Sequence, residues 1–392
     1  MKKIIQLFCF FVSLQVLTAC GGGSSAKKTT NSSPSIAVQR GALISATLIS
    51  TKQSFLLPYE VDAYKVIYKT LSIENKIINA SGLLAIPQKS NGEKSPFLSY
   101  QHGTIFLNSQ APSIHSSSID GIMVLAGTGY IVSAPDYLGY GESSKVMHPY
   151  IHAESLASAS VDMLRASKVF LAQEKILHNS QLFLAGYSEG GYATLALQKT
   201  LLEAHSSEFV VTASAAGAGP FDLAETSKIM AEKTINQKPA YLSFLLKAYD
   251  SIYGLNKISD MFQAQHVDVI NSHFDGHHSG STINSKLDHA TNRLFNSSFL
   301  NKLQGTGSHI IKNKFALNNI YDWKPKAPTR LYHGPNDEVV PYSNSQKALN
   351  SMNSNGAKNV SLVDCGFDTH GECAFPYVLN AVNFFSTYAN DL

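Results

Sequence analysis

Short apolar runs alternate with stretches of helical periodicity along most of this chain of 392 residues, and this alternation constrains the fold more than any other feature. Apolar runs at 129–134, 181–185, 209–216 and 329–333 predict buried strands, and the apolar stripe over 153–173 predicts a helix. Alternating strands and helices of these lengths form βαβ units, so we expect an α/β fold with a mostly parallel sheet flanked by helices. Further strands are expected at 96–100 and 360–363, and further helices at 120–127, 190–203, 343–352 and 373–388.

Two segments depart from this alternation. Residues 63–71 and 77–87 predict two early strands of antiparallel type. The stretch 221–323 has no clear alternation and is too long for a plain loop, so we expect a helical cap inserted over the C-terminal edge of the sheet. The α/β core would then comprise residues 41–220 and 324–392.

The composition excludes several classes of protein. Hydrophobic residues make up 44% of the chain and charged residues 15%, which argues against disorder and for a large packed core. A net charge of +3 gives no reason to expect a nucleic-acid partner. No apolar run after the N-terminus is long enough to predict a polytopic membrane protein.

The N-terminus has the features of an export signal. Lys2 and Lys3 precede an apolar run over 4–17, and Leu17-Thr18-Ala19-Cys20 resembles a bacterial lipobox. The resemblance implies a signal peptide over 1–19, a lipid on Cys20 and a flexible tether over 20–40. We therefore expect an exported protein anchored to a membrane, at the outer membrane or cell surface. An ordinary signal peptide with a chance cysteine is the alternative.

Two further cysteines lie near the C-terminus. Cys365 and Cys373 are eight residues apart, and in an exported chain this spacing favours a disulfide that closes a short loop. The alternative is two free thiols.

Gly186-Tyr187-Ser188-Glu189-Gly190 lies between a predicted strand and a predicted helix. This G-x-S-x-G pattern is typical of a nucleophile elbow, which lifts the serine hydroxyl to the N-terminus of a helix. The backbone N–H of Glu189 would then point at a developing oxyanion. The alternative role for Ser188 is that of a helix N-cap.

A nucleophilic serine needs a base and an acid that orients it. Asp337 follows the predicted strand that ends at His333, and His370 is the only later histidine. In one common type of triad the serine comes first in the chain, the acid second and the histidine last. Asp337 and His370 fit this order after Ser188. Asp364 and Asp368 are rival acids. A turn aspartate and a surface-loop histidine are the alternatives without catalytic role.

The loop after the strand at 96–100 is a candidate for the second oxyanion donor. Gly103 would let the backbone approach the substrate, and the N–H of Thr104 or Gly103 could donate. His102 precedes the nucleophile in the chain, so we expect it to be structural. Asp136 is expected to bond loop amides in a turn rich in glycine.

Four of these motifs together resemble the α/β-hydrolase superfamily over about residues 60–390. Within it they are similar to the secretory lipase family that includes fungal lipase A. The resemblance implies ester hydrolysis through an acyl-enzyme, with Ser188, Asp337 and His370 as the triad and an inserted helical lid. The motifs are HGT at 102–104, PDYLGYG at 135–141, GYSEGG at 186–191 and GPNDEVVP at 334–341.

No cofactor or metal is expected. The run of His273, Asp275, His277 and His278 could bind a metal, but nothing in the sequence indicates a tetrahedral geometry, and triad chemistry needs no metal. An ester, either a small molecule or a lipid, is the expected substrate. Two other functions stay open: a serine aminopeptidase or prolyl-type peptidase of the same fold, and a non-catalytic surface-binding lipoprotein.

Overall fold

The computed structural model describes residues 40–52, 57–114, 116–366 and 369–392, which carry a nine-stranded sheet. The strand order is β1-β2-β3-β5-β4-β6-β7-β8-β9. The predicted signal peptide, Cys20 and the rival acid Asp368 lie outside the described residues. The strands are β1 (Leu43–Lys52), β2 (Val61–Leu71), β3 (Ile77–Pro87), β4 (Ser95–Gln101), β5 (Ile131–Pro135), β6 (His178–Tyr187), β7 (Val211–Gly217), β8 (Thr329–His333) and β9 (Val360–Asp364).

The expected parallel sheet is confirmed, with one strand more than the sequence indicated. The strands from β5 to β9 in the sheet order run parallel, and β1, β2 and β3 form an antiparallel edge. The additional strand is β1, at the edge of the sheet. None of its residues is fully buried, and Ser45, Thr47 and Ser50 interrupt its apolar residues, so its sequence carries little hydrophobic periodicity.

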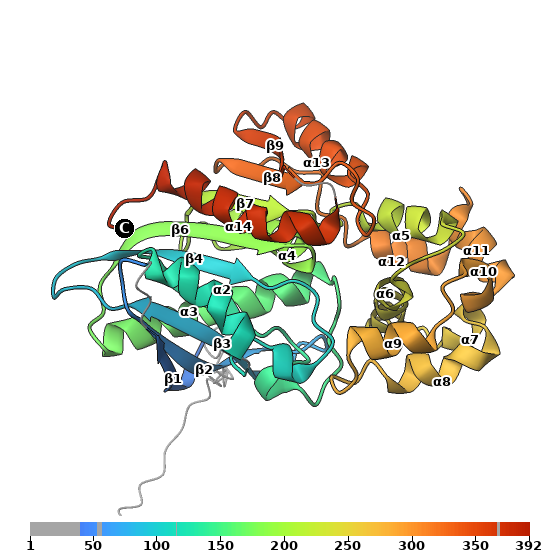
Figure 1. Cartoon of the computed structure of the whole chain (residues 1–392), viewed down its shortest axis with the longest axis horizontal. Coiled ribbons are helices and arrows are strands. Elements are labelled where there is room, and N and C mark those ends of the chain that lie inside the picture. Colours follow the sequence, from blue (N-terminus) through green and yellow to red (C-terminus); the bar gives the residue numbers. More distant parts are fainter. Residues whose placement is uncertain (1–39, 53–56, 115, 367–368) are drawn as a thin grey trace, which may run out of the picture. The chain divides into compact units, whose positions relative to one another are not determined.

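Helices cover both faces of the sheet (Figure 1). On one face α2 (Ser116–Gly127) and α14 (His370–Ser386) pack on the sheet, where Phe183 of β6 contacts Phe385 with ring centroids 5.0 Å apart. On the other face α3 (Ala153–Gln173) and α4 (Glu189–Ala204) cover Leu182 and Leu184 of the same strand. Each such buried side chain contributes about 1.5–3 kcal/mol to the stability of the fold.

The segments on either side of residues 221–323 also contain α13 (Ser343–Ser354) and the short 3₁₀ turns η1 (Asn108–Gln110) and η2 (Gly141–Ser143).

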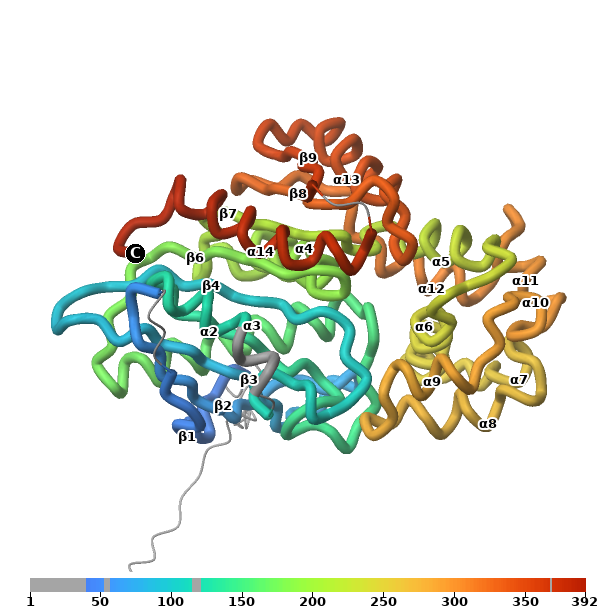
Figure 2. The backbone as a smooth tube through the Cα atoms, viewed as in Figure 1, coloured from blue at the N-terminus to red at the C-terminus, as the bar shows by residue number. Residues whose placement is uncertain are grey.

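Residues 221–323 are helical, and we call them the helical region. Figure 2 follows the chain as it leaves the sheet after β7, runs through these helices and returns at β8. The helical region lies beyond the C-terminal ends of the parallel strands (Figure 1). Its helices are α5 (Leu223–Glu232), α6 (Pro239–Ile252), α7 (Ile258–Met261), α8 (Ala264–Ser272), α9 (Gly280–Lys286), α10 (Thr291–Leu294), α11 (Ser297–Gln304) and α12 (Ile310–Ala316).

The helical region shares a hydrophobic core with the start of α4. Two buried tyrosines join the parts by hydrogen bonds: the Tyr249 hydroxyl donates to the carbonyl oxygen of Ile151 at 2.9 Å, and the Tyr192 hydroxyl donates to that of Asn318 at 2.6 Å. A buried hydroxyl without a partner would be costly, so these bonds also restrict how the two parts pack.

Candidate active site

Ser188 stands on a tight turn between β6 and α4. Its backbone has φ 61° and ψ −121°, a conformation that residues other than glycine rarely adopt. The flanking glycines leave no room for a side chain, since a Cβ at Gly186 would lie 2.3 Å from the carbonyl oxygen of Gly190. A Cβ at Gly190 would lie 2.0 Å from that of Gln101. The Ser188 side chain makes no capping bond to α4, in contrast to the N-cap alternative.

Three side chains from distant positions form one hydrogen-bonded chain. The Nε2 atom of His370 lies 2.9 Å from the Oγ atom of Ser188, and its Nδ1 atom lies 2.6 Å from Oδ2 of Asp337. Ser188 follows β6, Asp337 follows β8 and His370 follows β9. These strands belong to the parallel part of the sheet, so their C-terminal ends share one edge. Because the carboxylate accepts from Nδ1–H, Nε2 is free to accept the hydroxyl proton of Ser188.

The carboxylate of Asp337 is fully buried and accepts hydrogen bonds at both oxygens. The backbone N–H groups of Val339 and Val340 each donate to Oδ1 at 2.8 Å, while His370 and His333 face Oδ2. Burial alone raises the pKa of Asp337, but the hydrogen bonds from His333 and His370 outweigh it and hold the pKa well below its usual range. Asp337 is therefore an anion at neutral pH and can stabilise an imidazolium.

His333 is a partner of this site that the sequence analysis missed. Its Nε2 atom lies 2.9 Å from the carbonyl oxygen of Val340 and 3.1 Å from Oδ2 of Asp337, and its Nδ1 atom lies 2.7 Å from Oγ of Ser345. The Nε2–H group donates to the carbonyl oxygen of Val340 and also faces the carboxylate oxygen that His370 uses. The signal in the sequence was its place at the end of β8, four residues before Asp337.

The rival acid Asp364 does not contact His370. It ends β9, its residue is exposed, and its Oδ1 atom accepts from the backbone N–H of Gly366 at 2.8 Å.

The candidate oxyanion donors lie in the loop after β4 and at the first residue of α4. Gly103 follows β4, the strand beside β6, and a Cβ there would lie 3.2 Å from the carbonyl oxygen of Tyr187. Thr104 is tied down by a 2.9 Å hydrogen bond between its hydroxyl and that of Tyr150. Glu189 is the first residue of α4, so its N–H has no acceptor within the helix.

His102 and Asp136 sit behind this loop. The His102 ring nitrogens face two carbonyl oxygens, of Gly103 at 2.8 Å and of Asp136 at 3.2 Å, and burial lowers the pKa of His102. The Asp136 carboxylate accepts from Ser81 Oγ at 2.6 Å and from the Ser113 N–H at 2.8 Å. Both residues therefore join loops to one another and do not reach Ser188.

The side chain of Glu189 forms a second histidine–carboxylate pair, which the sequence analysis also missed. Its Oε1 atom lies 2.8 Å from Nε2 of His148, and both side chains are buried. The Nδ1 atom of His148 lies 2.7 Å from the carbonyl oxygen of Leu138 and must donate, since a carbonyl only accepts. A second proton therefore lies between Nε2 and Oε1. Among the described residues, the buried Oε2 atom of Glu189 has no partner.

A small cavity of about 40 Å³ adjoins Ser188 and Glu189. It is mostly apolar, and the helical region forms much of its wall. The other lining residues are Tyr150, Ile151, Pro220, Leu223, Thr226, Met230, Tyr241, Leu242, Leu245, Val339 and Val340.

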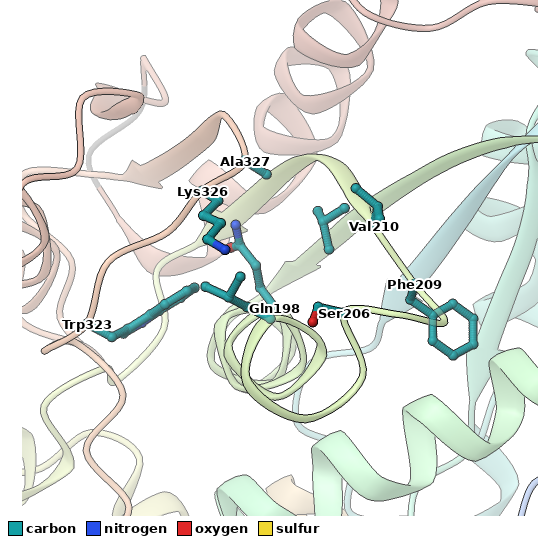
Figure 3. Close-up of a pocket in the computed structure, with 9 residues that line it drawn as sticks. Gln198, Ser206, Phe209, Val210, Trp323, Lys326 and Ala327 are labelled. Carbon is teal, nitrogen blue, oxygen red and sulfur yellow. The ribbon is translucent and has the colours of Figure 1, made fainter.

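A larger cavity of about 230 Å³ lies elsewhere, beside the N-terminal ends of β7 and β8 (Figure 3). Gln198, Trp323 and Lys326 are among its lining residues, and it includes none of the candidate catalytic residues. Its position at the opposite ends of the parallel strands separates it from Ser188.

Cys365 and Cys373 form the disulfide that the sequence favoured, with Cα atoms 5.6 Å apart. His370 lies inside the loop that this disulfide closes. It is the first residue of α14, which begins three residues earlier than expected.

Within the described ranges, no group of three or more His, Cys, Asp or Glu residues could hold a metal ion. In the histidine run, His278 Nδ1 bonds Asp275 Oδ1 at 3.0 Å and its ring lies against that of His273.

Comparison with solved structures finds esterases and lipases. The rice cell wall degrading esterase LipA from Xanthomonas oryzae superposes with a TM-score of 0.82 and 26% sequence identity, over 89% of this chain and 98% of that chain. Candida antarctica lipase A in its closed state has a TM-score of 0.69 over 91% of this chain and 84% of that chain. At 16% identity, the latter supports the fold alone. No curated protein matches the chain.

The secretory lipase family model matches residues 107–385, which include Ser188, Asp337 and His370. The match covers well over half of the chain. The chain therefore belongs to the secretory lipase family and is a hydrolase of the lipase and esterase class with the α/β-hydrolase fold.

Proposed function

We propose that this hydrolase cleaves carboxylic esters through a covalent acyl-enzyme on Ser188. The observation that carries the proposal is the chain of hydrogen bonds from Ser188 Oγ through His370 to Asp337. In the first step His370 Nε2 takes the hydroxyl proton while Oγ attacks the ester carbonyl carbon. The proton then passes to the leaving alcohol oxygen, and the carbon–oxygen bond to that alcohol breaks.

The second step returns the enzyme to its starting state. A water molecule gives a proton to His370 Nε2 and attacks the acyl carbon, and the acid leaves as Ser188 Oγ regains the proton. In both steps a negative charge develops on the carbonyl oxygen. We assign its stabilisation to the backbone N–H groups of Glu189 and of Thr104 or Gly103, since such donors typically contribute about 10²–10³ in rate. Asp337 stabilises the imidazolium without taking its proton.

The helical region acts in this proposal as a cap, inserted between core segments 41–220 and 324–392. This role is supported by the cavity beside Ser188, because α5 and α6 form much of the cavity wall. The cap would define the acyl-binding space and exclude bulk water during turnover.

The central test uses purified protein and p-nitrophenyl acetate. We expect Ser188→Ala to lower kcat at least about 10⁴-fold with an unchanged circular dichroism spectrum. Ser281→Ala, which removes an exposed hydroxyl on α9, is the matched control and keeps full activity. A fluorophosphonate probe should add one covalent mass to the wild type, at Ser188. Equal turnover by Ser188→Ala would contradict the proposal, and faster cleavage of aminoacyl anilides would indicate a peptidase.

Membership of the secretory lipase family indicates an exported protein. None of the helices that the structure describes is long and apolar enough to cross a membrane. We propose that a lipid on Cys20 anchors the mature chain. Wild-type protein should then partition into detergent and Cys20→Ser into the aqueous phase, whereas equal partitioning would contradict the anchor.

A further inference from the structure

Glu338, the residue after Asp337, lies between His370 and the helical region. Its Oε2 atom accepts a hydrogen bond from the backbone N–H of His370 at 3.0 Å, and its Oε1 atom lies 3.4 Å from Nζ of Lys238. The Nζ atom of Lys233 donates to its carbonyl oxygen at 2.5 Å. Lys233 directly follows α5 and Lys238 directly precedes α6, so both ends of the α5–α6 connection contact this one residue.

Each contact has a physical basis. His370 is the first residue of α14, so its N–H lacks an acceptor within the helix, and a carboxylate is favourable at a helix N-terminus. Burial raises the pKa of Glu338, but the bond from the His370 N–H and the charge of Lys238 lower it below its usual range. The side chains of Glu338 and Lys238 are 42% and 40% exposed, so their attraction is modest and salt screens it.

The same two helices cover Ser188. Thr226 and Met230 of α5 and Tyr241 and Leu245 of α6 line the cavity of about 40 Å³ beside the serine. Pockets for small ligands usually have about 300–1,000 Å³. An ester with a bulky acyl group therefore requires α5 and α6 to move, and such a movement pulls on the lysines that hold Glu338.

We propose that Glu338 is a positioning residue through which the α5–α6 connection controls the alignment of His370 on Ser188. The inference rests on the proposed ester hydrolysis. With the connection closed, the lysines hold Glu338 and its carboxylate holds the first turn of α14. When the connection moves away, His370 loses this restraint. Fast turnover is then reserved for esters over which α5 and α6 can close, so the contact contributes to acyl selectivity.

The test is a double-mutant cycle on kcat for p-nitrophenyl acetate, at low salt. Glu338→Gln keeps an acceptor for the His370 N–H but loses the attraction of Lys238, and Lys238→Gln removes the same attraction from the other side. We expect each to lower kcat about three- to tenfold with little change in KM, and the double variant to be no slower than either. Glu338→Ala, which loses both contacts, should be the slowest.

Salt and a matched control separate this role from general destabilisation. Lys257→Gln, which removes another exposed cation of the helical region that pairs with Asp260, should keep the wild-type kcat. Wild-type kcat should fall between 0.01 and 1 M salt, over which the Debye length shrinks from about 30 to 3 Å, while that of Lys238→Gln should stay flat. The thermal midpoints of all variants should agree within about 2 °C, because exposed pairs add little stability.

Two results would overturn the inference. One is a Lys238→Gln variant as active as Lys257→Gln, and the other is a double variant whose losses simply add. Failure of the proposed function would look different, since the wild type would then neither hydrolyse the ester nor react with a fluorophosphonate at Ser188.

Discussion

Two histidine–carboxylate pairs flank Ser188, and they differ in which ring nitrogen faces the carboxylate. His370 contacts Asp337 through Nδ1 and leaves Nε2 for the serine. His148 contacts Glu189 through Nε2, and its Nδ1 is bonded to a backbone carbonyl. The second ring has no nitrogen left for a nucleophile. The comparison shows that a buried histidine beside a carboxylate is a candidate base only when its other nitrogen is free.

The two carboxylates differ as well. Asp337 has hydrogen-bond donors at both oxygens, which keep it ionised. Glu189 has one partnered oxygen and one buried oxygen without a partner among the described residues. The surroundings of Asp337 suit a charge that persists while the imidazole of His370 gains and loses a proton. The Glu189 carboxylate instead joins α4 to the loop that carries His148.

The largest expected difference is in catalysis by the two histidines. We expect His370→Asn to lower kcat for p-nitrophenyl acetate about 10⁴- to 10⁶-fold, because no group remains to accept the serine proton. His148→Asn should lower kcat less than about 100-fold. Steady-state kinetics on both variants measures the difference. Comparable losses of kcat would contradict the different roles assigned to His370 and His148.

The acid offers the next largest effect. Asp337→Asn should lower kcat about 10⁴-fold, since the amide favours the wrong tautomer of His370 and cannot stabilise its cation. Asp364→Asn removes the rival carboxylate and should leave kcat within about twofold. A large loss of kcat in Asp364→Asn instead would mean that Asp364, and not Asp337, is the acid of the triad.

The Glu189 pair should affect stability more than turnover. Glu189→Ala leaves His148 buried without its partner, so we expect the free energy of unfolding to fall by about 3–5 kcal/mol. Glu189→Gln should cost less, because its amide N–H can donate to Nε2 of a neutral His148. Urea unfolding of the two variants measures the difference. Equal losses would mean that the hydrogen bond contributes little.

The smallest effect concerns pH. The folded-state pKa of Asp337 is depressed, so its contribution to stability is full above the unfolded value of about 4 and is lost as the pH falls below it. The difference in unfolding free energy between wild type and Asp337→Asn should therefore shrink as the pH falls below about 4. A difference that grew on acidification would contradict the depressed pKa.

The triad and the parallel sheet could be predicted from the sequence, because both follow from the order of strands and motifs along the chain. Parallel strands end at a common edge, so residues after β6, β8 and β9 could be expected to meet, and Ser188, Asp337 and His370 lie within hydrogen-bond distance. The glycines of the elbow mark its tight turn. The alternation of apolar runs likewise predicted the parallel sheet.

Other features depend on packing that a linear pattern does not record. His148 and Glu189 are 41 residues apart, and nothing in their local sequences links them. The contact of His333 with Asp337 requires the loop after β8 to fold back on its own strand. The edge strand β1 was missed because polar residues interrupt its apolar ones and none of its residues is buried, so its main evidence is the pairing with β2.

The backbone of Ser188, with φ at 61°, has a consequence for engineering this chain. A conformation of this kind costs about 1–3 kcal/mol for a residue with a side chain, and glycine adopts it without strain. Directed evolution scored only on heat resistance would therefore enrich glycine at position 188 and discard the hydroxyl. Any such library needs a simultaneous screen for ester turnover.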